Sequence, residues 1–163
     1  RKIEALFKQL EGGRSNPTEV LEELATALVA HMVIEEKIFY PAARSVRSDL
    51  VLESYEEHEM AAYGLKRLIG ADTERETFKA KVGVEKEVFE RHVKMEEQEL
   101  LPAVAEALGD EQNDELGRQM EARFKELVEG GYEAAVAARK ARRSGDGARG
   151  KGSKKSMEQT AGR

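Results

Sequence analysis

Apolar residues recur at intervals of three and four along five stretches of this chain, which is the spacing of an amphipathic helix. The pattern predicts helices over residues 1–11, 17–42, 48–69, 74–108 and 116–141. Because the connections between these helices are short, we expect an all-α fold. The expected architecture is an up-down antiparallel four-helix bundle with an additional C-terminal helix, which packs outside the bundle or across one end.

Several helix boundaries carry their own signals. Asn16 before Pro17 is typical of a helix start, and Thr73 with Glu76 forms a capping-box pattern. The expected stops are the glycines at 12, 13, 70 and 109, and the expected cap of the third helix is Ser48 or Asp49. The stripe expected to face the core on that third helix comprises Leu52, Tyr55, His58, Ala62, Leu65 and Ile69.

Charge is distributed unevenly along the chain. The 163 residues carry a formal net charge of -5, but residues 139–163 hold nine basic and two acidic residues, so the rest of the chain is strongly acidic. The basic segment is rich in Gly, Ser and Lys and has no apolar period. We therefore expect a helical domain over residues 1–137 and a disordered basic tail over 138–163. No aromatic residues interleave the basic ones, so nucleic-acid binding is not expected.

The composition narrows the possible chemistry. The chain has no cysteine and three histidines, so any metal must be held by imidazole and carboxylate groups. There is no apolar run long enough to span a membrane, and no P-loop, Gly-rich dinucleotide turn or Ser nucleophile elbow. The chain begins inside a helical pattern without Met, so we expect residues upstream. A cytoplasmic location is expected, with a removed signal peptide left open.

Two histidines each have a glutamate four residues later. His31 pairs with Glu35, and His92 pairs with Glu96. Residues spaced in this way lie about 40° apart around a helix and roughly 6 Å apart along it, so each pair points two ligand groups in the same direction. Each pair could therefore hold one edge of a metal site.

The surroundings of the two pairs repeat each other. His-x-x-x-Glu-Glu-x-x-x-Tyr-Pro-Ala begins at His31, and His-x-x-x-Glu-Glu-x-x-x-Leu-Pro-Ala begins at His92, a constant offset of 61 residues. A duplicated helical hairpin would place the two pairs opposite each other across the bundle. Burying both carboxylates on apolar stripes costs several kcal/mol unless a cation compensates them. Lys37, Arg91 and Lys94 lie off these faces, so the pattern predicts a dinuclear metal site.

Other residues extend the predicted site. His58 supplies a third imidazole from the third helix, and the repeat predicts that a fourth histidine precedes Arg1. Tyr55, three residues before His58 and on its face, is a candidate ligand or hydrogen-bond donor, the alternative being a core tyrosine. We expect the neighbouring acids Glu36, Glu59 and Glu97 to be solvated or to lie beside the ligands.

These motifs resemble the hemerythrin-like HHE cation-binding family over roughly residues 1–130. The resemblance implies a four-helix bundle that holds two non-haem iron ions with an oxo or hydroxo bridge. Glu35 and Glu96 would bridge the irons, and His31, His58 and His92 would be terminal ligands. Ferritin-like proteins use Glu-x-x-His motifs instead, so iron storage is a weaker interpretation. The ligand types also permit Mn or Zn.

The sequence departs from oxygen-carrying hemerythrins at Ala62, where those proteins have a second histidine, and at Glu96, where they use Asp at a wider spacing. One imidazole fewer favours an open centre that reacts with O2, peroxide or NO, and a catalase-like or other di-iron oxidoreductase activity is one hypothesis. An iron- or oxygen-sensing or iron-handling module without turnover is the alternative, and a metal-free helical interaction domain is the third. The sequence leaves the oligomeric state open.

Overall fold

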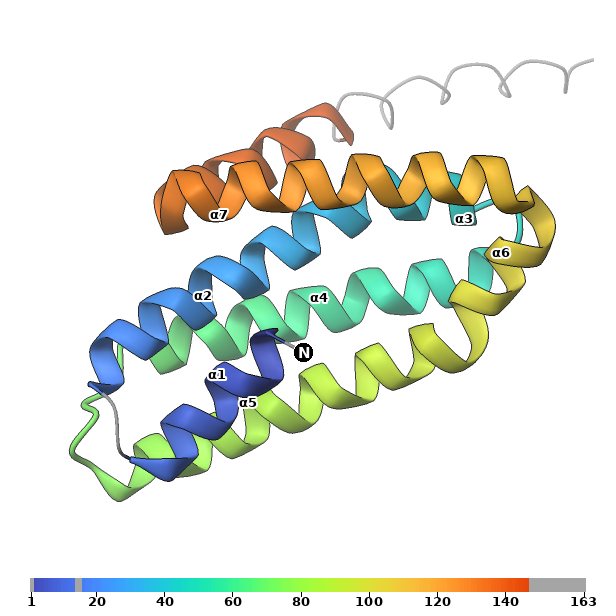
Figure 1. The fold of residues 1–163 in the computed structure, drawn as a ribbon. Coiled ribbons are helices and arrows are strands. Elements are labelled where there is room, and N and C mark those ends of the chain that lie inside the picture. Colours follow the sequence, from blue (N-terminus) through green and yellow to red (C-terminus); the bar gives the residue numbers. More distant parts are fainter. Residues whose placement is uncertain (1, 14–15, 147–163) are drawn as a thin grey trace, which may run out of the picture.

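A computed structural model describes residues 2–13 and 16–146, and its regular elements are helical throughout these ranges (Figure 1). The helices are α1 (Lys2–Gly12), α2 (Pro17–Ile34), α3 (Tyr40–Ala43), α4 (Ser48–Ile69), α5 (Glu76–Met95), α6 (Leu101–Leu108) and α7 (Asp110–Asp146). Two five-residue π-helical turns, η1 (Glu35–Phe39) and η2 (Glu96–Leu100), join α2 to α3 and α5 to α6. None of the described helices is both long and apolar enough to cross a membrane.

Four helices form a closed ring of neighbours. α1 packs against α2 and α5, and α4 packs against the same two helices. Buried apolar side chains form two clusters. One, among α1, α2, α4, α5 and α7, includes Phe7, Leu24 and Phe89, and the other, among η1, α3, α4, η2 and α6, includes Phe39 and Leu100. The predicted helical bundle is therefore observed, and its interior has an apolar cluster toward each end.

The two π-helical turns stand at equivalent places in the internal repeat, 61 residues apart. Pro41 and Pro102 each follow one of them. Proline has no N–H to donate, and its ring clashes with the carbonyl four residues earlier, so the helix widens. The N–H of Tyr40 accordingly donates to the carbonyl of Glu35, five residues back, and the N–H of Leu101 donates to that of Glu96. Each widened turn begins at the glutamate of a His–Glu pair.

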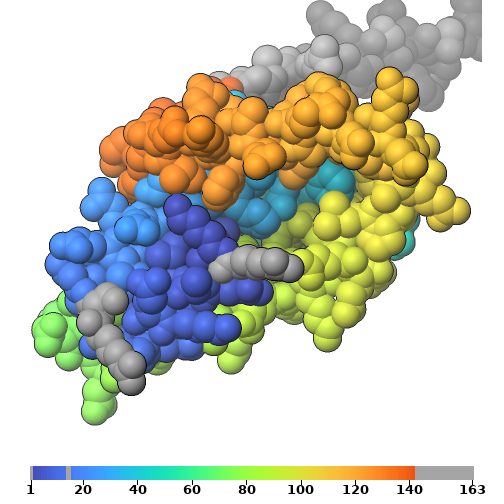
Figure 2. All heavy atoms as spheres, in the orientation of Figure 1, coloured from blue at the N-terminus to red at the C-terminus, as the bar shows by residue number. Residues whose placement is uncertain are grey.

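Helix α7 consists of two segments that meet at Gly131, whose φ of 79° and ψ of 179° are not helical. The first segment runs along the outside of the bundle from α6, and the second turns back, as Figure 1 shows. In the space-filling view, α7 lies against α2 along one side of the molecule (Figure 2). The predicted domain boundary at residue 137 falls inside this second segment, and residues 147–163 of the predicted tail lie outside the described residues.

The helix caps predicted from the sequence are confirmed at one helix start and wrong at two others. Asn16 caps α2 as predicted, since its side chain accepts a hydrogen bond from the N–H of Thr18 at 3.1 Å. The capping box at Thr73 was wrong, because Asp72 accepts from the N–H of Glu74 and forms a turn there, and α5 begins at Glu76. The cap predicted at Ser48 or Asp49 was also wrong: α4 begins at Ser48, the position before it has no side-chain cap, and Asp49 pairs with Arg47.

The core face of α4 is rotated from the predicted stripe. Leu52 and Ile69 are 50% and 41% exposed. The buried positions of this helix are instead Leu50, Val51, Ser54, Glu57, His58, Ala61, Leu65 and Leu68. This face includes an acidic residue, Glu57, whose carboxylate contacts a histidine at the centre of the bundle.

Candidate metal centre

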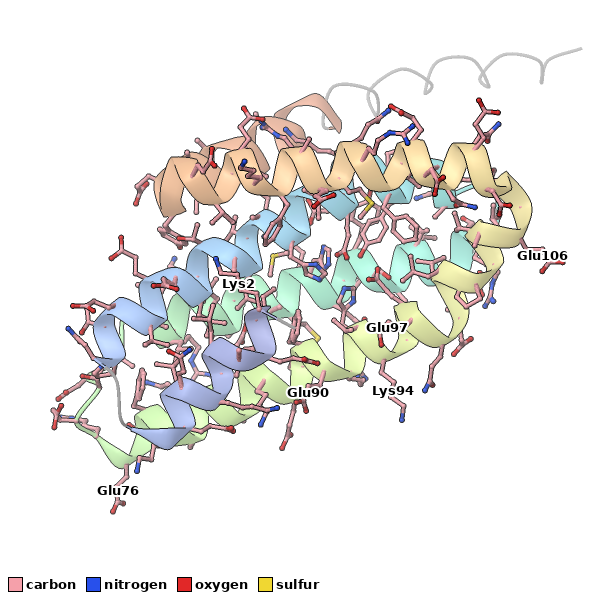
Figure 3. The ribbon with its side chains drawn as sticks, in the orientation of Figure 1. Lys2, Glu76, Glu90, Lys94, Glu97 and Glu106 are labelled. Atoms are coloured by element: carbon pink, nitrogen blue, oxygen red, sulfur yellow. The ribbon has the colours of Figure 1, made fainter. Side chains whose placement is uncertain are left out.

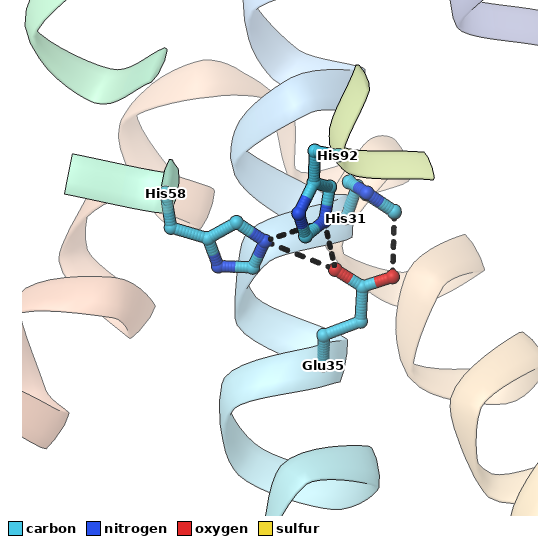
Figure 4. Close-up of side chains that lie close together, drawn as sticks. All are labelled: His31, Glu35, His58 and His92. Carbon is cyan, nitrogen blue, oxygen red and sulfur yellow. Dashed lines mark hydrogen bonds and ion pairs between the residues drawn. The ribbon is translucent and has the colours of Figure 1, made fainter. Parts of the chain in front are cut away.

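Four predicted ligands meet between the two apolar clusters. His31 comes from the end of α2, Glu35 from the start of η1, His58 from the middle of α4, and His92 from the end of α5. Each offers one ligand atom, and these atoms all lie within 4.8 Å of one another (Figure 4). Glu35, His58 and His92 are buried and His31 is half-buried. The outward residues Glu90 and Lys94 on α5 point away from this interior (Figure 3).

The ligand atoms converge on Glu35. Its Oε1 lies 3.2 Å from His31 Nδ1, and its Oε2 lies 3.1 Å from His58 Nε2 and 3.6 Å from His92 Nε2. The two Nε2 atoms of His58 and His92 are 3.1 Å apart. Ligand atoms bound side by side to one ion at about 2.1 Å stand about 3.0–3.4 Å apart, so this spacing fits coordination of a metal ion.

Two polar atoms of the cluster are buried without a hydrogen-bond partner: His31 Nε2 and Glu35 Oε2. A buried polar atom without a partner costs about 1–3 kcal/mol, and a metal ion between the side chains would satisfy both of these atoms. Nitrogen and carboxylate oxygen are donors for Fe, Mn and Zn. The residues present therefore fit a metal ion of this class.

Glu96 lies at the edge of the cluster. Its Oε2 is 3.5 Å from His92 Nε2, and its Oε1 accepts a hydrogen bond of 2.9 Å from the hydroxyl of Tyr40. This hydroxyl also lies 3.2 Å from His58 Nε2. The second His–Glu pair thus reaches the same interior space as the first, from the opposite side of the bundle.

Burial and neighbouring groups shift the pKa values of these side chains in different directions. Burial lowers the pKa of His31 to about 4, so its ring is neutral and its lone pair is available. Burial raises the pKa of Glu35, but the surrounding imidazoles of His31, His58 and His92 outweigh this effect and hold the pKa below the usual range. Burial and the charge of Glu35 raise the pKa of Glu96 to about 10. Burial without a cation thus favours the neutral forms of His31 and Glu96, and a bound cation would favour the ionised form of Glu96.

Two further acids hold the outer nitrogens of the imidazoles. Glu36 Oε1 lies 3.2 Å from His58 Nδ1, and Glu57 Oε2 lies 2.9 Å from His92 Nδ1. Because an ionised carboxylate only accepts, each Nδ1 carries the proton and each Nε2 lone pair faces the cluster. Histidine ligands of metals commonly have such carboxylate partners. Glu36 was expected to be solvated or beside the ligands and is buried, whereas Glu97 is exposed.

Tyr40 is the main residue of the site that the sequence did not indicate. It is buried, and burial raises its pKa above the usual range. A regular α-helix would turn it away from Glu35, but the π-helical turn places residues five apart above one another. Tyr55, the predicted candidate, lies behind it: the rings are 5.0 Å apart, and its hydroxyl donates to the carbonyl oxygen of Glu36 at 3.4 Å.

Comparisons with known proteins agree with this geometry. A family model described as "Hemerythrin HHE cation binding domain" matches residues 1–104. Among solved structures, a hemerythrin HHE cation-binding domain-containing protein from Mycobacterium kansasii aligns with a TM-score of 0.71 and 23% identity. The alignment covers 83% of this chain and 91% of the other. None of the curated proteins matches this chain.

Proposed function

Because this chain belongs to the hemerythrin HHE cation-binding domain family, we propose that it is a non-haem di-iron protein whose centre binds or reacts with O2, peroxide or NO. The observation that carries the proposal is the convergence of three imidazoles and Glu35, with ligand atoms within 4.8 Å, in a buried space with unpartnered polar atoms. We further propose that α1, α2, α4 and α5 form the up-down antiparallel bundle of the family.

The proposed ligands have distinct roles. Glu35 and Glu96 would be shared between the two irons, and His31, His58 and His92 would each hold one iron as a terminal ligand. When bound, two adjacent irons would supply two electrons to O2 or to peroxide. Around them, Glu36 and Glu57 fix the orientation of His58 and His92 through the Nδ1 protons.

Neighbouring side chains control the surroundings of the centre. The hydroxyl oxygen of Tyr40 lies 2.9 Å from Glu96 Oε1 and donates its proton in a hydrogen bond to that carboxyl group. Phe89 packs its ring 5.5 Å from that of His31, and Phe39 is buried on the side toward α3. These aromatic rings exclude water, which strengthens the electrostatic interactions inside the site.

Ala62 supports the hypothesis of an open, reactive centre. It lies one turn after His58 and lines a cleft of about 430 Å³ between α2, α4 and the second segment of α7. An imidazole at this position would fill part of that space. The proposed ligands do not line this cleft, so it is the missing imidazole at Ala62 that favours turnover over protected oxygen storage.

The test begins with metal content. Protein loaded with iron should bind about two irons per chain and show a near-ultraviolet absorption band that the metal-free protein lacks. Substitution E96A should lower the iron content, whereas E97A, which removes the exposed neighbouring carboxylate, should leave it unchanged. Wild-type protein that binds no iron under these conditions would refute the di-iron proposal.

Mixing with hydrogen peroxide then distinguishes the reactions. Evolution of O2, followed with an oxygen electrode, supports a catalase-like activity. Reversible O2 uptake without any loss of peroxide would instead assign the protein to oxygen binding. A metal-free interaction domain predicts that H31A changes neither metal content nor stability, and the unpartnered atoms of His31 and Glu35 argue against it.

A sensing module remains the second candidate, because one contact favours it. Arg139, on the second segment of α7, donates to Glu36, and this same Glu36 holds His58. An element outside the bundle thus contacts the surroundings of the metal centre, which a readout of metal occupancy would require.

A further inference from the structure

A chain of hydrogen bonds links helix α7 to a proposed metal ligand. The guanidinium of Arg139 donates from Nε at 3.2 Å and from Nη2 at 3.0 Å to Glu36 Oε1. The same oxygen accepts from His58 Nδ1 at 3.2 Å. Arg139 Nη2 also donates to Glu59 at 2.8 Å. The side chain of Arg139 is only 12% exposed, so its charge-assisted bonds to Glu36 are partly buried, whereas the bond to Glu59 lies at the surface.

The second segment of α7 presents Arg139 from a docked face. Ala135 is fully buried, and Tyr132 and Val136 pack against the apolar cluster that includes Leu24 and Phe89. Tyr132, Val136 and Arg139 have the spacing of one helix face, so docking of the apolar part brings the guanidinium to Glu36. The segment starts immediately after Gly131, where the chain reverses.

The other outer carboxylate has an arginine partner of a different kind. Arg91 donates to Glu57 at 2.8 Å, and Glu57 accepts from His92 Nδ1. Arg91 directly precedes His92 on α5, and its side chain is 67% exposed. The support of His92 is therefore local to α4 and α5, whereas the support of His58 comes from residue 139, beyond the residues 1–104 that the family model matches.

We propose that Arg139 is a positioning residue for the metal centre, and that metal occupancy and docking of residues 132–146 stabilise each other. This inference rests on the proposed metal-binding function. Arg139 holds the Glu36 carboxylate in place through two hydrogen bonds, and Glu36 in turn accepts from His58 Nδ1 and keeps the opposite Nε2 aimed at the metal. Loss of an outer partner of this kind typically weakens metal binding about 10- to 100-fold. Coupling between two binding events is reciprocal, so metal must favour docking of the segment by the same factor.

The experiment compares R139Q with two matched variants. K125Q removes one positive charge from the exposed first segment of α7, and R91Q removes the partner of the other outer carboxylate. Iron affinity is measured by competition with a chelator, and amide hydrogen exchange is measured for residues 132–141 with and without iron. We expect R139Q to weaken iron binding about 10-fold or more and K125Q to leave it unchanged.

Hydrogen exchange provides the reciprocal measurement. In the wild-type protein and in R91Q, iron should slow exchange of residues 132–141 by about the factor that R139Q loses in affinity. In R139Q, iron should leave that exchange unchanged. The R139Q absorption spectrum should also shift relative to wild type, and R139K, which retains the charge but not the fork of donors, should recover part of the affinity.

The outcomes separate this inference from the proposed function. If wild-type protein binds no iron, the proposed function and this inference are both refuted. If wild type binds iron but R139Q binds it within about 2-fold of wild type, or if iron leaves exchange of the segment unchanged in wild type, only the inference is overturned. If R139Q does not fold, the exchange measurement on wild type decides alone: slower exchange of residues 132–141 with iron supports the inference, and unchanged exchange overturns it.

Discussion

Glu85 is a buried acid far from the proposed ligands, and its titration should control the stability of the bundle. The residue is 3% exposed on α5, its Oε1 has no hydrogen-bond partner, and Arg67 and Lys81 line the cleft beside it. Burial raises the pKa of Glu85 from 4.5 to about 7. The folded protein therefore holds a proton more tightly than the unfolded chain does. The substitution E85Q removes this titration and keeps the size of the side chain.

The sign and the size of the effect follow from this pKa. An acid whose pKa is raised on folding imposes no penalty below the unfolded pKa of 4.5, and the penalty grows until the pH passes the folded pKa of about 7. A tenfold change in proton affinity corresponds to about 1.4 kcal/mol, so the ionised form costs about 3 kcal/mol of stability at pH 8. E85Q should therefore be more stable than wild type at pH 8, by up to about 3 kcal/mol, and gain little at pH 4.

Urea denaturation followed by circular dichroism at several pH values measures this difference. The free energy of unfolding of E85Q minus that of wild type is the informative quantity, because contributions from the other titrating groups cancel. E87Q, at an exposed position on the same helix, is the matched control and should show no pH-dependent difference. A difference between E85Q and wild type that stays constant from pH 4 to pH 8 would refute the reasoning.

Three other substitutions test separate features of the structure. Y40F removes the hydrogen bond to Glu96 and should lower the free energy of unfolding of the metal-free protein by about 1–3 kcal/mol in urea denaturation. An unchanged free energy of unfolding would mean that Glu96 Oε1 finds another partner. G64A places a Cβ against the carboxylate at the end of the flexible Glu85 side chain, which must move aside, so the cost should be about 1 kcal/mol or less. This cost should shrink in a G64A/E85A double mutant, and equal costs in both backgrounds would exclude the clash. G131A forces alanine into a backbone conformation that only glycine adopts readily, at a cost of about 1–3 kcal/mol. This substitution should speed proteolysis of residues 132–146. Unchanged proteolysis would show that the chain reversal tolerates a side chain.

Helix content and the proposed ligands could be predicted because both depend on local spacing. The glycines at 13 and 109 have positive φ at helix ends, and His31, Glu35, His58 and His92 meet as the repeat implied. These features need only a regular helical period and two equivalent hairpins. The position of Tyr40 could not be predicted from a regular helical period, because it depends on the π-helical turn before Pro41. The available signal was an aromatic residue, Tyr40, five positions after the predicted ligand Glu35 and directly before Pro41.

The remaining errors arose where distant parts of the chain decide the outcome. The observed core face of α4 differs from the predicted one, because Leu52 fits the apolar stripe but is exposed, and Glu57 is an acid but is buried. An acid at Glu57, in a run of buried positions that includes Ser54 and Ala61, could have indicated a partner for a histidine. Nothing local indicates that Arg139 contacts Glu36, since that contact follows from the reversal at Gly131.

The long separation between Glu36 and Arg139 has a consequence for synthesis of the protein. The two residues are 103 positions apart, so the ribosome must complete almost the whole helical part before they can meet. His31 and Glu35 emerge early and His92 much later, and Arg139 emerges last. A nascent chain can therefore gather the inner ligands before the surroundings of His58 are complete. Under the proposed role of Arg139, secure retention of metal would be a late step in the maturation of each molecule, because the C-terminal segment must first leave the ribosome.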